Sequence, residues 1–341
     1  MKVKLGLFLC WVTTLAWGQG TPPRGYLMAE LPSSARLVAL GGANVSATQN
    51  DLSLFWANPA LLGEASHHRL ALGYQGYYQS SVLQASFGWH QSWGTIAGGV
   101  TAWNFGSVQG YDAAGVPTTT FSTGAWVASA SYARQQGPFT MAASLKVARD
   151  QLMLDGGTAL LADVAGLYQH PTLDLRVGVV ASNLGGVLGG QATGEIPWDV
   201  RIGGSFKPEH MPFRISLTVK DLYRYDIVNF DSTTGREEEK PSTAQQLFAH
   251  VVIGGEIILG KSITGMVGFN PQRRIELQLP SFGGLTGFSF GLEARIKQFA
   301  LGYGVAFQNL AGGTHQVTLT TDFSSWLVKE RTVNVPIEGL E

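Results

Sequence analysis

Residues 287–308 read GFSFGLEARIKQFALGYGVAFQ, and apolar side chains fill every second position in two parts of this stretch. From Phe290 to Ile296 they alternate with glycine and charged residues, and from Phe299 to Val305 they alternate with glycine and alanine. A period of two places the two sets of side chains on opposite faces of an extended strand. Only Lys297 and Gln298 separate the two parts, so we expect two antiparallel strands joined by a short turn.

The same alternation recurs from His68 onward and predicts about fourteen strands. They are His68–Tyr78, Ser81–His90, Gly94–Asn104, Thr123–Gln135, Phe139–Asp150, Leu160–His170, Leu173–Ser182, Trp198–Phe206, Phe213–Tyr223, Ala249–Leu259, Ile263–Phe269, Gly287–Ile296, Phe299–Gln308 and Thr314–Phe323. Every second connection is short, as at Gln136–Pro138 and Pro171–Thr172, whereas Phe105–Ser122 and Arg224–Phe248 are long. Outer-membrane barrels have short turns at one end and long loops at the other, so short and long connections alternate along their chains. Soluble β-sandwiches do not require this alternation. The chain is therefore predicted to be an all-β protein, a transmembrane antiparallel β-barrel.

Composition agrees with a membrane barrel. The chain has 341 residues, 44 of them glycine, only 14% charged residues and a net charge of −1. This balance excludes a basic nucleic-acid-binding surface, and 45% hydrophobic residues exclude intrinsic disorder. After the first twenty residues, no apolar run is long enough to form a membrane-spanning helix.

The N-terminus predicts export. Lys2 and Lys4 precede the apolar run Leu5–Leu15, and the small residues Ala16 and Gly18 follow at the −3 and −1 positions of a cleavage site, which is the pattern of a secretory signal peptide. We therefore expect a signal peptide in residues 1–18, a barrel in residues 68–323 and a polar C-terminal tail in residues 324–341. The expected location is the outer membrane of a Gram-negative bacterium, with lipid and lipopolysaccharide as surroundings.

The two faces of the predicted strands differ in character. The apolar set is expected to face lipid, and the other set to line the lumen with small residues and charges of both signs. The predicted lumen charge network comprises Lys146, Asp174, Arg176, Asp199, Arg201, Arg214, Lys220, Glu256, Glu293 and Arg295. Pairing across the lumen is the favoured interpretation, and a path for a solute is the alternative.

Residues 19–67 lack this alternation, and we expect them to form an N-terminal hatch, or plug, inside the barrel. Gly41 and Gly42 permit close backbone approach, and Pro59 fixes a turn after Asn58. A disordered periplasmic leader is the alternative. The segment contains a motif made of Ser34, Ala35, Arg36, Ala39, Leu40, Gly41, Gly42, Asp51, Asn58, Pro59 and Ala60.

These positions resemble the N-terminal region of the PorV/PorQ family of type IX secretion outer-membrane proteins, which are relatives of FadL-type transporters. The length of the chain favours the PorQ side. The resemblance implies a hatch motif at Gly41, Gly42, Asp51, Asn58, Pro59 and Ala60. It also implies a non-enzymatic component that anchors a PorZ-like surface protein, with a PorU-like sortase and a PorV-like barrel as indirect partners.

No residue pattern points to catalysis or to a cofactor. The only cysteine, Cys10, lies in the predicted signal peptide, and no histidine has a partner at metal-ligand spacing. His67 and His68 beside Glu64 are the best metal candidate and are disfavoured; His315 has no serine partner for lipase chemistry. We expect no metal site, no cofactor and no nucleic-acid partner.

The long connection after Tyr223 combines aromatic and charged residues, as protein interfaces do. Its candidate partner-binding residues are Tyr223, Tyr225, Ile227, Phe230 and Arg236. The competing function is a FadL-like transporter of a small apolar molecule, against which the charged lumen argues. An assembly factor without a surface partner is a third, weaker alternative.

Overall fold

The structure is a computed structural model that describes residues 25–48, 51–77, 80–112, 114–152, 155–190, 194–228, 242–277, 284–309 and 312–324. The predicted signal peptide lies outside these residues, as does the predicted tail after Ser324.

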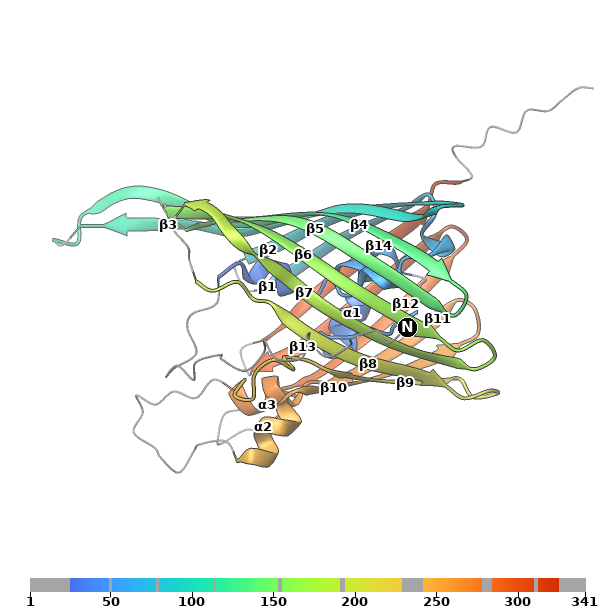
Figure 1. Cartoon of the computed structure of the whole chain (residues 1–341). Coiled ribbons are helices and arrows are strands. Elements are labelled where there is room, and N and C mark those ends of the chain that lie inside the picture. Colours follow the sequence, from blue (N-terminus) through green and yellow to red (C-terminus); the bar gives the residue numbers. More distant parts are fainter. Residues whose placement is uncertain are drawn as a thin grey trace, which may run out of the picture.

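Fourteen antiparallel strands form a closed barrel in which each strand pairs with its sequence neighbours and β1 pairs with β14 (Figure 1). The strands are β1 (Arg69–Tyr77), β2 (Ser80–Gln91), β3 (Gly94–Tyr111), β4 (Pro117–Gln136), β5 (Phe139–Leu152), β6 (Asp155–Gln169), β7 (Asp174–Gly190), β8 (Asp199–Lys207), β9 (Phe213–Val219), β10 (Val251–Leu259), β11 (Ile263–Phe269), β12 (Phe288–Ile296), β13 (Phe299–Asn309) and β14 (Gly312–Asp322). The predicted fold class and strand number are confirmed.

Alternation sorts the side chains as expected. On β5, Met141 and Leu145 point outward and are 72% and 63% exposed, whereas Lys146 and Ala148 point inward and are 1% and 0% exposed. A closed barrel leaves no backbone edge for lipid to meet, and its outer surface here is apolar. The short turns lie at one end, which in outer-membrane barrels is the periplasmic end.

The wall of the barrel has uneven height. Strands β3 and β4 have 18 and 20 residues, whereas β9 and β11 have seven each. The predicted loop Phe105–Ser122 was wrong over most of its length, because β3 and β4 continue as a hairpin that projects beyond the rim (Figure 1). The hairpin tolerates register shifts near Gly106, whose φ is +84°.

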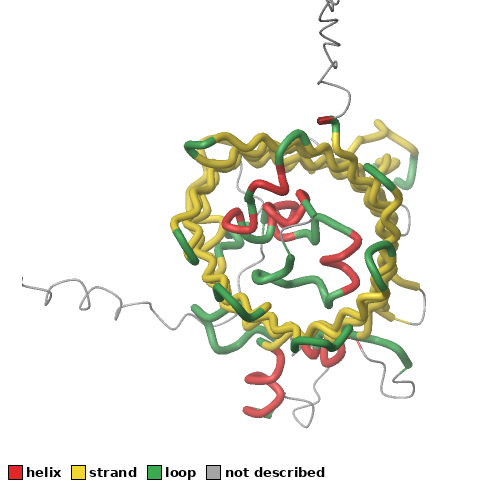
Figure 2. Tube along the Cα trace, turned by 90° about the vertical axis from the view of Figure 1, so that its right-hand side faces the viewer, coloured by secondary structure: helices red, strands yellow, loops and turns green. Residues whose placement is uncertain are grey.

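Residues 25–66, of which 49–50 are not described, lie inside the barrel (Figure 2). We call them the plug segment. The segment contains α1 (Ala35–Ala39) and four short 3₁₀ helices, η1 (Leu27–Glu30), η2 (Leu52–Trp56), η3 (Pro59–Leu61) and η4 (Glu64–Ser66). Helices α2 (Thr243–Ala249) and α3 (Pro271–Leu277) belong to the opposite, extracellular end, in connections that the sequence predicted as loops.

Short polar side chains begin the turns of the plug segment. The Ser34 hydroxyl accepts a hydrogen bond from the Leu37 amide, and the Asp51 carboxylate accepts one from the Ser53 amide. The Asn58 side chain accepts from the Ala60 amide at 2.9 Å and donates to the Val45 carbonyl at 2.7 Å. Such caps satisfy backbone groups that short helices leave without partners.

Glycines on the inner wall let the backbone of the plug segment approach closely. A Cβ atom at Gly178 would collide with the Val45 carbonyl, and one at Gly304 would collide with the Ala35 carbonyl. At Gly268 it would collide with the amide nitrogen of Gly41. These contacts explain why many inward positions that could hold side chains hold glycine instead.

None of the helices in the described part of the chain has the length and apolarity that crossing a membrane requires.

Candidate functional site

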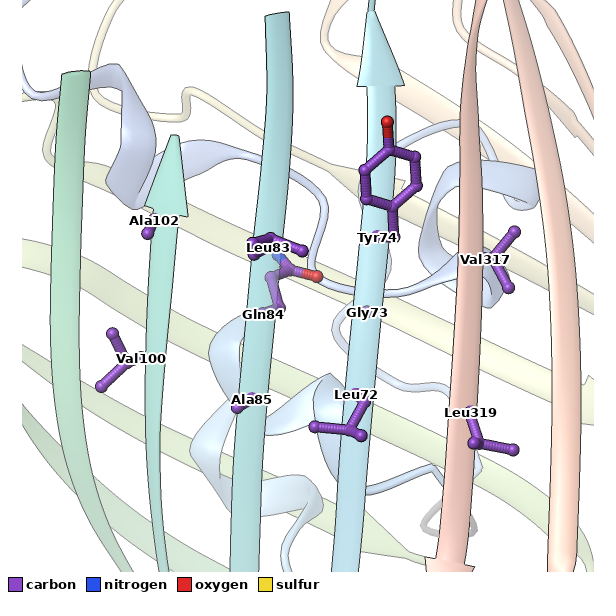
Figure 3. Close-up of a pocket in the computed structure, with 10 residues that line it drawn as sticks. All are labelled: Leu72, Gly73, Tyr74, Leu83, Gln84, Ala85, Val100, Ala102, Val317 and Leu319. Atoms are coloured by element: carbon purple, nitrogen blue, oxygen red, sulfur yellow. The ribbon is translucent and has the colours of Figure 1, made fainter. Parts of the chain in front are cut away.

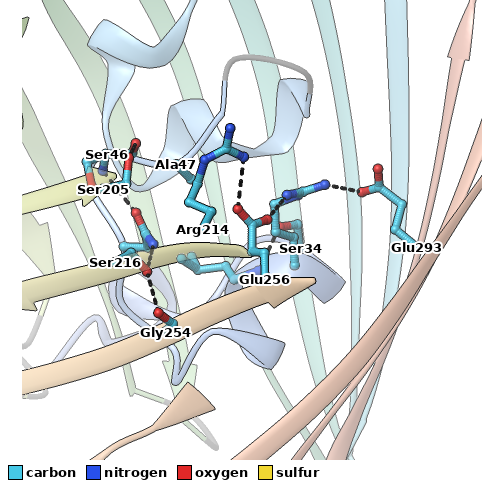
Figure 4. Close-up of polar contacts among 12 residues, drawn as sticks. Ser34, Ser46, Ala47, Ser205, Arg214, Ser216, Gly254, Glu256 and Glu293 are labelled. Atoms are coloured by element: carbon cyan, nitrogen blue, oxygen red, sulfur yellow. Dashed lines mark hydrogen bonds and ion pairs between the residues drawn. The ribbon is translucent and has the colours of Figure 1, made fainter. Parts of the chain in front are cut away.

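Arg36 of the plug segment is the centre of a buried ion network (Figure 4). Its guanidinium contacts the Glu256 carboxylate and pairs with Glu293 at 2.9 Å. Arg214 bridges Glu256 at 3.1 Å and Asp174 at 2.6 Å. Because Arg36 and Glu256 are 5% and 3% exposed, these pairs exclude most water, and the loss of one partner would be costly.

The Glu293 carboxylate also pairs with Arg295, at 3.1 Å. Arg176 lies beside this network and donates a hydrogen bond to the Ala47 carbonyl at 3.3 Å. Together these groups line a polar cavity of about 610 Å³ next to the β10–β11 turn, at the periplasmic end.

A second group of charges lies near the start of β8. The Asp199 carboxylate contacts the Arg201 guanidinium and accepts a hydrogen bond from the Asp221 amide at 2.7 Å. Arg201 also reaches Glu30 of the plug segment at 3.9 Å. Lys220 contacts Asp221 at 3.5 Å and the side chain of Gln272 on α3.

A third group is buried at β5, β6 and β7. Lys146 and Asp163 form an ion pair at 2.6 Å, and each is 1% exposed. The Lys146 ammonium also donates to the Asn183 side-chain oxygen, and the Asn183 amide donates to Asp163 at 2.8 Å. Asn183 has a φ of +59° and lies beside a register irregularity between β6 and β7. The ion pair therefore stabilises the irregular backbone of the wall at Asn183 through these hydrogen bonds.

The ten predicted lumen charges all lie on the barrel strands or next to them, but they divide into these three groups. Pairing across the lumen was expected, whereas the observed ion pairs lie within one strand, join adjacent strands, join β7 to β9 or join the wall to the plug segment. The sequence did not single out Arg36 as a charged centre, although it belongs to the N-terminal motif. Its partners Glu256 and Glu293 lie more than 200 positions later in the chain.

Part of the lumen beside β2 to β6 is apolar, next to the buried Lys146–Asp163 pair, and the sequence did not reveal this feature. Tyr26 and Met28 of the plug segment form a buried cluster with inward-facing apolar residues of the wall. Trp56, Trp103 and Ile196 pack against this cluster. The inward members from the wall are Val82, Ala125, Val127, Ala148, Ala159 and Leu161. Because the outward residues of these strands are also apolar, inward valine and leucine do not stand out in the sequence. Only the assembled barrel shows that they form a cluster.

Among the described residues, the strand pairing of the wall has a gap between β7 and β8. Their last paired residues are Ser182 and Asp199, yet β7 continues beyond this point to Gly190, paired only with β6. At about 3.3 Å per residue, the eight unpaired residues of β7 span about 26 Å. The side chain of Asn183 donates to the Pro197 carbonyl at 3.0 Å and marks the lower end of this gap.

Apolar side chains lie on both faces of the wall near the lower end of the gap. In register, Leu184 is opposite Ala162, which is opposite Leu145, and Leu145 is a lipid-facing residue. Ile196, which follows β7 and precedes β8, packs against the apolar cluster inside the lumen. The lower end of the gap therefore has the exposed Leu184 on its outer face and apolar lumen residues on its inner side.

The hatch-motif residues lie within the plug segment. Gly41 and Gly42 both have φ values of +94°, and the Asn270 side chain donates to the Gly41 carbonyl at 3.0 Å. Asp51 and Asn58 cap 3₁₀ helices, and Pro59 and Ala60 form the first turn of η3.

Of the candidate partner-binding residues, Phe230 and Arg236 lie outside the described residues. Tyr225 is 56% exposed, and the Tyr223 ring lies against Trp198 with a centroid distance of 3.9 Å. Ile227 is buried with Val228 and Ala249, so its prediction as a surface contact was wrong.

The outer face has an apolar groove of about 540 Å³ across β14, β1, β2 and β3 (Figure 3). Leu72, Tyr74, Leu83 and Val100 line it and are exposed on the lipid-facing side. Its position suits lipid chains rather than a solute in the lumen. Among the described residues, no group of three or more His, Cys, Asp or Glu side chains could hold a metal ion.

Comparisons with known proteins support the fold. No family model and no curated protein matches the chain. The Pseudomonas putida toluene transporter TodX is similar in structure with a TM-score of 0.53 and 10% identity, over 85% of this chain and 96% of that chain. A TodX deltaS2S3 mutant gives a TM-score of 0.52 and 12% identity, over 85% and 99%. A Pseudomonas aeruginosa FadL homologue gives 0.47 and 9%, over 85% and 98%.

The first two likenesses show that the chain has the fold of an outer-membrane β-barrel of the TodX kind. The closed ring, the apolar outer surface and this fold confirm the predicted location in the outer membrane of a Gram-negative bacterium. The finer resemblance to PorV/PorQ remains a prediction.

Proposed function

We propose that the protein is a non-enzymatic transporter that passes small apolar molecules from the cell surface into the outer membrane through the gap between β7 and β8. The observation that carries this proposal is the unpaired edge Asn183–Gly190 beside the apolar cluster of the lumen. TodX, which shares the fold, is a toluene transporter, and this likeness supports an apolar substrate.

The distribution of charge supports this route. Most charged residues of the lumen lie at β7 to β12, and the buried Lys146 and Asp163 of β5 and β6 are paired with each other. The side formed by β2 to β6 presents Val82, Val127 and Leu161 to the interior. An apolar molecule beside these three residues would therefore contact apolar surface, and the Lys146 and Asp163 charges nearby are already paired.

The plug segment supports a lateral exit rather than a straight path to the periplasm. Phe55, Leu61 and Leu62 are almost completely buried between the plug segment and the wall. A molecule above them would have to displace a packed core to continue along the barrel axis. The gap in the wall offers a route that leaves this core intact.

The test measures uptake of radiolabelled toluene by cells that express the protein. A Cβ at Gly186 would meet no atom within 4 Å, so G186R places a cation at the gap without a collision. The matched control is G98R, because Gly98 faces lipid and lies in the same register row as Leu184, through Ala130 and Leu145. Uptake should fall at least tenfold in G186R and stay near the wild-type rate in G98R. Equal uptake by the two variants would refute the lateral path.

A second candidate function is the surface platform of a type IX secretion attachment complex, favoured by the N-terminal motif from Ser34 to Gly42. The projecting β3–β4 hairpin, with Tyr111 and Val116 64% and 55% exposed, offers a surface for a PorZ-like partner. Purification of the native outer-membrane complex separates the two functions. Stoichiometric recovery of a surface protein, with no toluene uptake, would favour the platform.

A further inference from the structure

The shortest part of the wall does not match the thickness of the membrane. Strands β9 and β11 have seven residues each, whereas a membrane-crossing strand needs about 9–11. Seven residues at about 3.3 Å each, tilted by about 40°, give an apolar height of roughly 18 Å. The apolar band of outer-membrane barrels is about 25 Å tall. At β9 and β11 the wall is therefore short by roughly 7 Å, whereas β10 between them, with nine residues, reaches about 23 Å.

Helices α2 and α3 lie at the extracellular end of this short wall. Figures 1 and 2 show α2 outside the circle of strands, below the end of β10. The side of α2 that faces the protein buries Gln246 and Ala249. Ala249 forms a buried cluster with Ile227 and Val228, and Ile275 of α3 packs against this cluster. The opposite side exposes Leu247 and Phe248, which are 65% and 51% exposed. In water these two large apolar side chains would be unfavourably placed.

A groove of about 470 Å³ lies between α2 and α3. Its apolar lining includes Phe248, Ile275 and Phe269, and Phe269 is the last residue of β11. The Phe269 ring contacts Phe288 of β12, with a centroid distance of 4.8 Å, so the groove continues the lipid-facing surface of the barrel. Arg274 also lines the groove, and its guanidinium donates to the Thr286 carbonyl at 3.1 Å.

We propose that α2 and α3 are embedded in the outer leaflet, where they complete the apolar surface above β9 to β11, and that their groove holds an acyl chain of an outer-leaflet lipid. The shortfall in the wall and the continuity of the groove with the lipid-facing surface both point to lipid as the occupant. Arg274 places a fixed positive charge beside the groove, which suits the anionic headgroup of such a lipid. An amphipathic helix at this depth binds with its apolar face toward the acyl chains.

The absence of cysteine after Cys10 permits a direct measurement of depth. The full chain, reconstituted in vesicles of phosphatidylcholine and phosphatidylglycerol, carries a nitroxide label at L247C. Two single-cysteine variants calibrate the measurement: L217C on the lipid-facing side of β9, and A114C at the tip of the β3–β4 hairpin. Accessibility to oxygen relative to a water-soluble nickel complex should be at least fivefold higher at L247C than at A114C, and close to that at L217C.

The groove is tested with a fluorescent label at F248C and phosphatidylglycerol that carries brominated acyl chains. Quenching should exceed that of the same label at A114C by at least threefold, and A244W, which fills the groove, should remove most of the difference. Heat-modified gel mobility verifies that each variant forms the barrel. Water-like accessibility at L247C would overturn the proposal and would point to a protein partner for this face. Lipid-like accessibility with quenching that A244W leaves unchanged would overturn the acyl-chain site.

Discussion

Replacement of Arg36 by alanine should release α1 from the barrel wall while the ring of strands stays folded. Arg36 is 5% exposed and pairs with both Glu256 and Glu293. Its removal leaves two buried carboxylates with one cation fewer between them. The Ser34 cap and the backbone hydrogen bond from Leu40 to the Arg36 carbonyl do not depend on the guanidinium, so the helix itself can persist.

The structure sets the size of the effect. Removal of one partner from a buried ion pair costs about 3–5 kcal/mol. Here Glu256 keeps Arg214 at 3.1 Å and Glu293 keeps Arg295 at 3.1 Å, which reduces the loss. We therefore expect the free energy of opening at α1 to fall by about 2–3 kcal/mol, at about 1.4 kcal/mol per tenfold change. This corresponds to a rise in the opening equilibrium constant of roughly 30- to 150-fold.

Amide hydrogen exchange with mass spectrometry measures this change in detergent or in nanodiscs. Protection of the α1 peptide, which contains the Leu40 and Gly42 amides, should fall by the stated factor. Protection of β4 and β5 should remain unchanged. A matched control is R295A, because Arg295 is 35% exposed and pairs with one carboxylate, so its loss should change α1 protection by less than tenfold. A fall of less than tenfold in R36A, or an equal fall in β4 and β5, would refute the role assigned to this network.

Three further outcomes are expected. G268A should overpack the contact with the plug segment at a cost of about 1–3 kcal/mol and lower the urea midpoint for unfolding of this segment, whereas G265A on the lipid-facing side of the same strand should not. Hydrogen exchange of the plug segment at increasing urea concentrations gives the midpoint for each variant. K146M should destabilise the folded barrel by about 3–5 kcal/mol by leaving Asp163 buried without its cation, and D163N in the same chain should restore part of the loss in gel-based urea titrations. N183A should cost more than N183G in the same titration, since glycine accepts the φ of +59°; equal midpoints would contradict this.

The ring of strands could be predicted from the sequence because its exposed and buried positions alternate without interruption along most strands. Strand β5 was predicted to begin at Phe139, as observed, and to end at Asp150, two residues before its end at Leu152. The outward Met141 and Leu145 and the inward Lys146 show why: each position has one environment, lipid or lumen, and the residue type reports it.

The remaining features depend on contacts that no local pattern encodes. Strand β7 was predicted to end at Ser182, but the positive φ of Asn183 shifts its phase and the strand continues through glycines that carry no alternation. The charge network needs Arg36 beside Glu256, which are 220 positions apart. Helix α2 is short and lies in a connection that was predicted as a loop, so its apolar face was not recognised.

The plug segment has a consequence for the order of assembly. It precedes β1 in the chain, and it is packed against glycines on several strands. The ring closes where β1 pairs with β14. A segment held this tightly has no room to thread into a finished ring. The joining of the first and last strands is therefore expected to come after residues 25–66 have entered the enclosed space, so barrel biogenesis and packing of the interior are a single event.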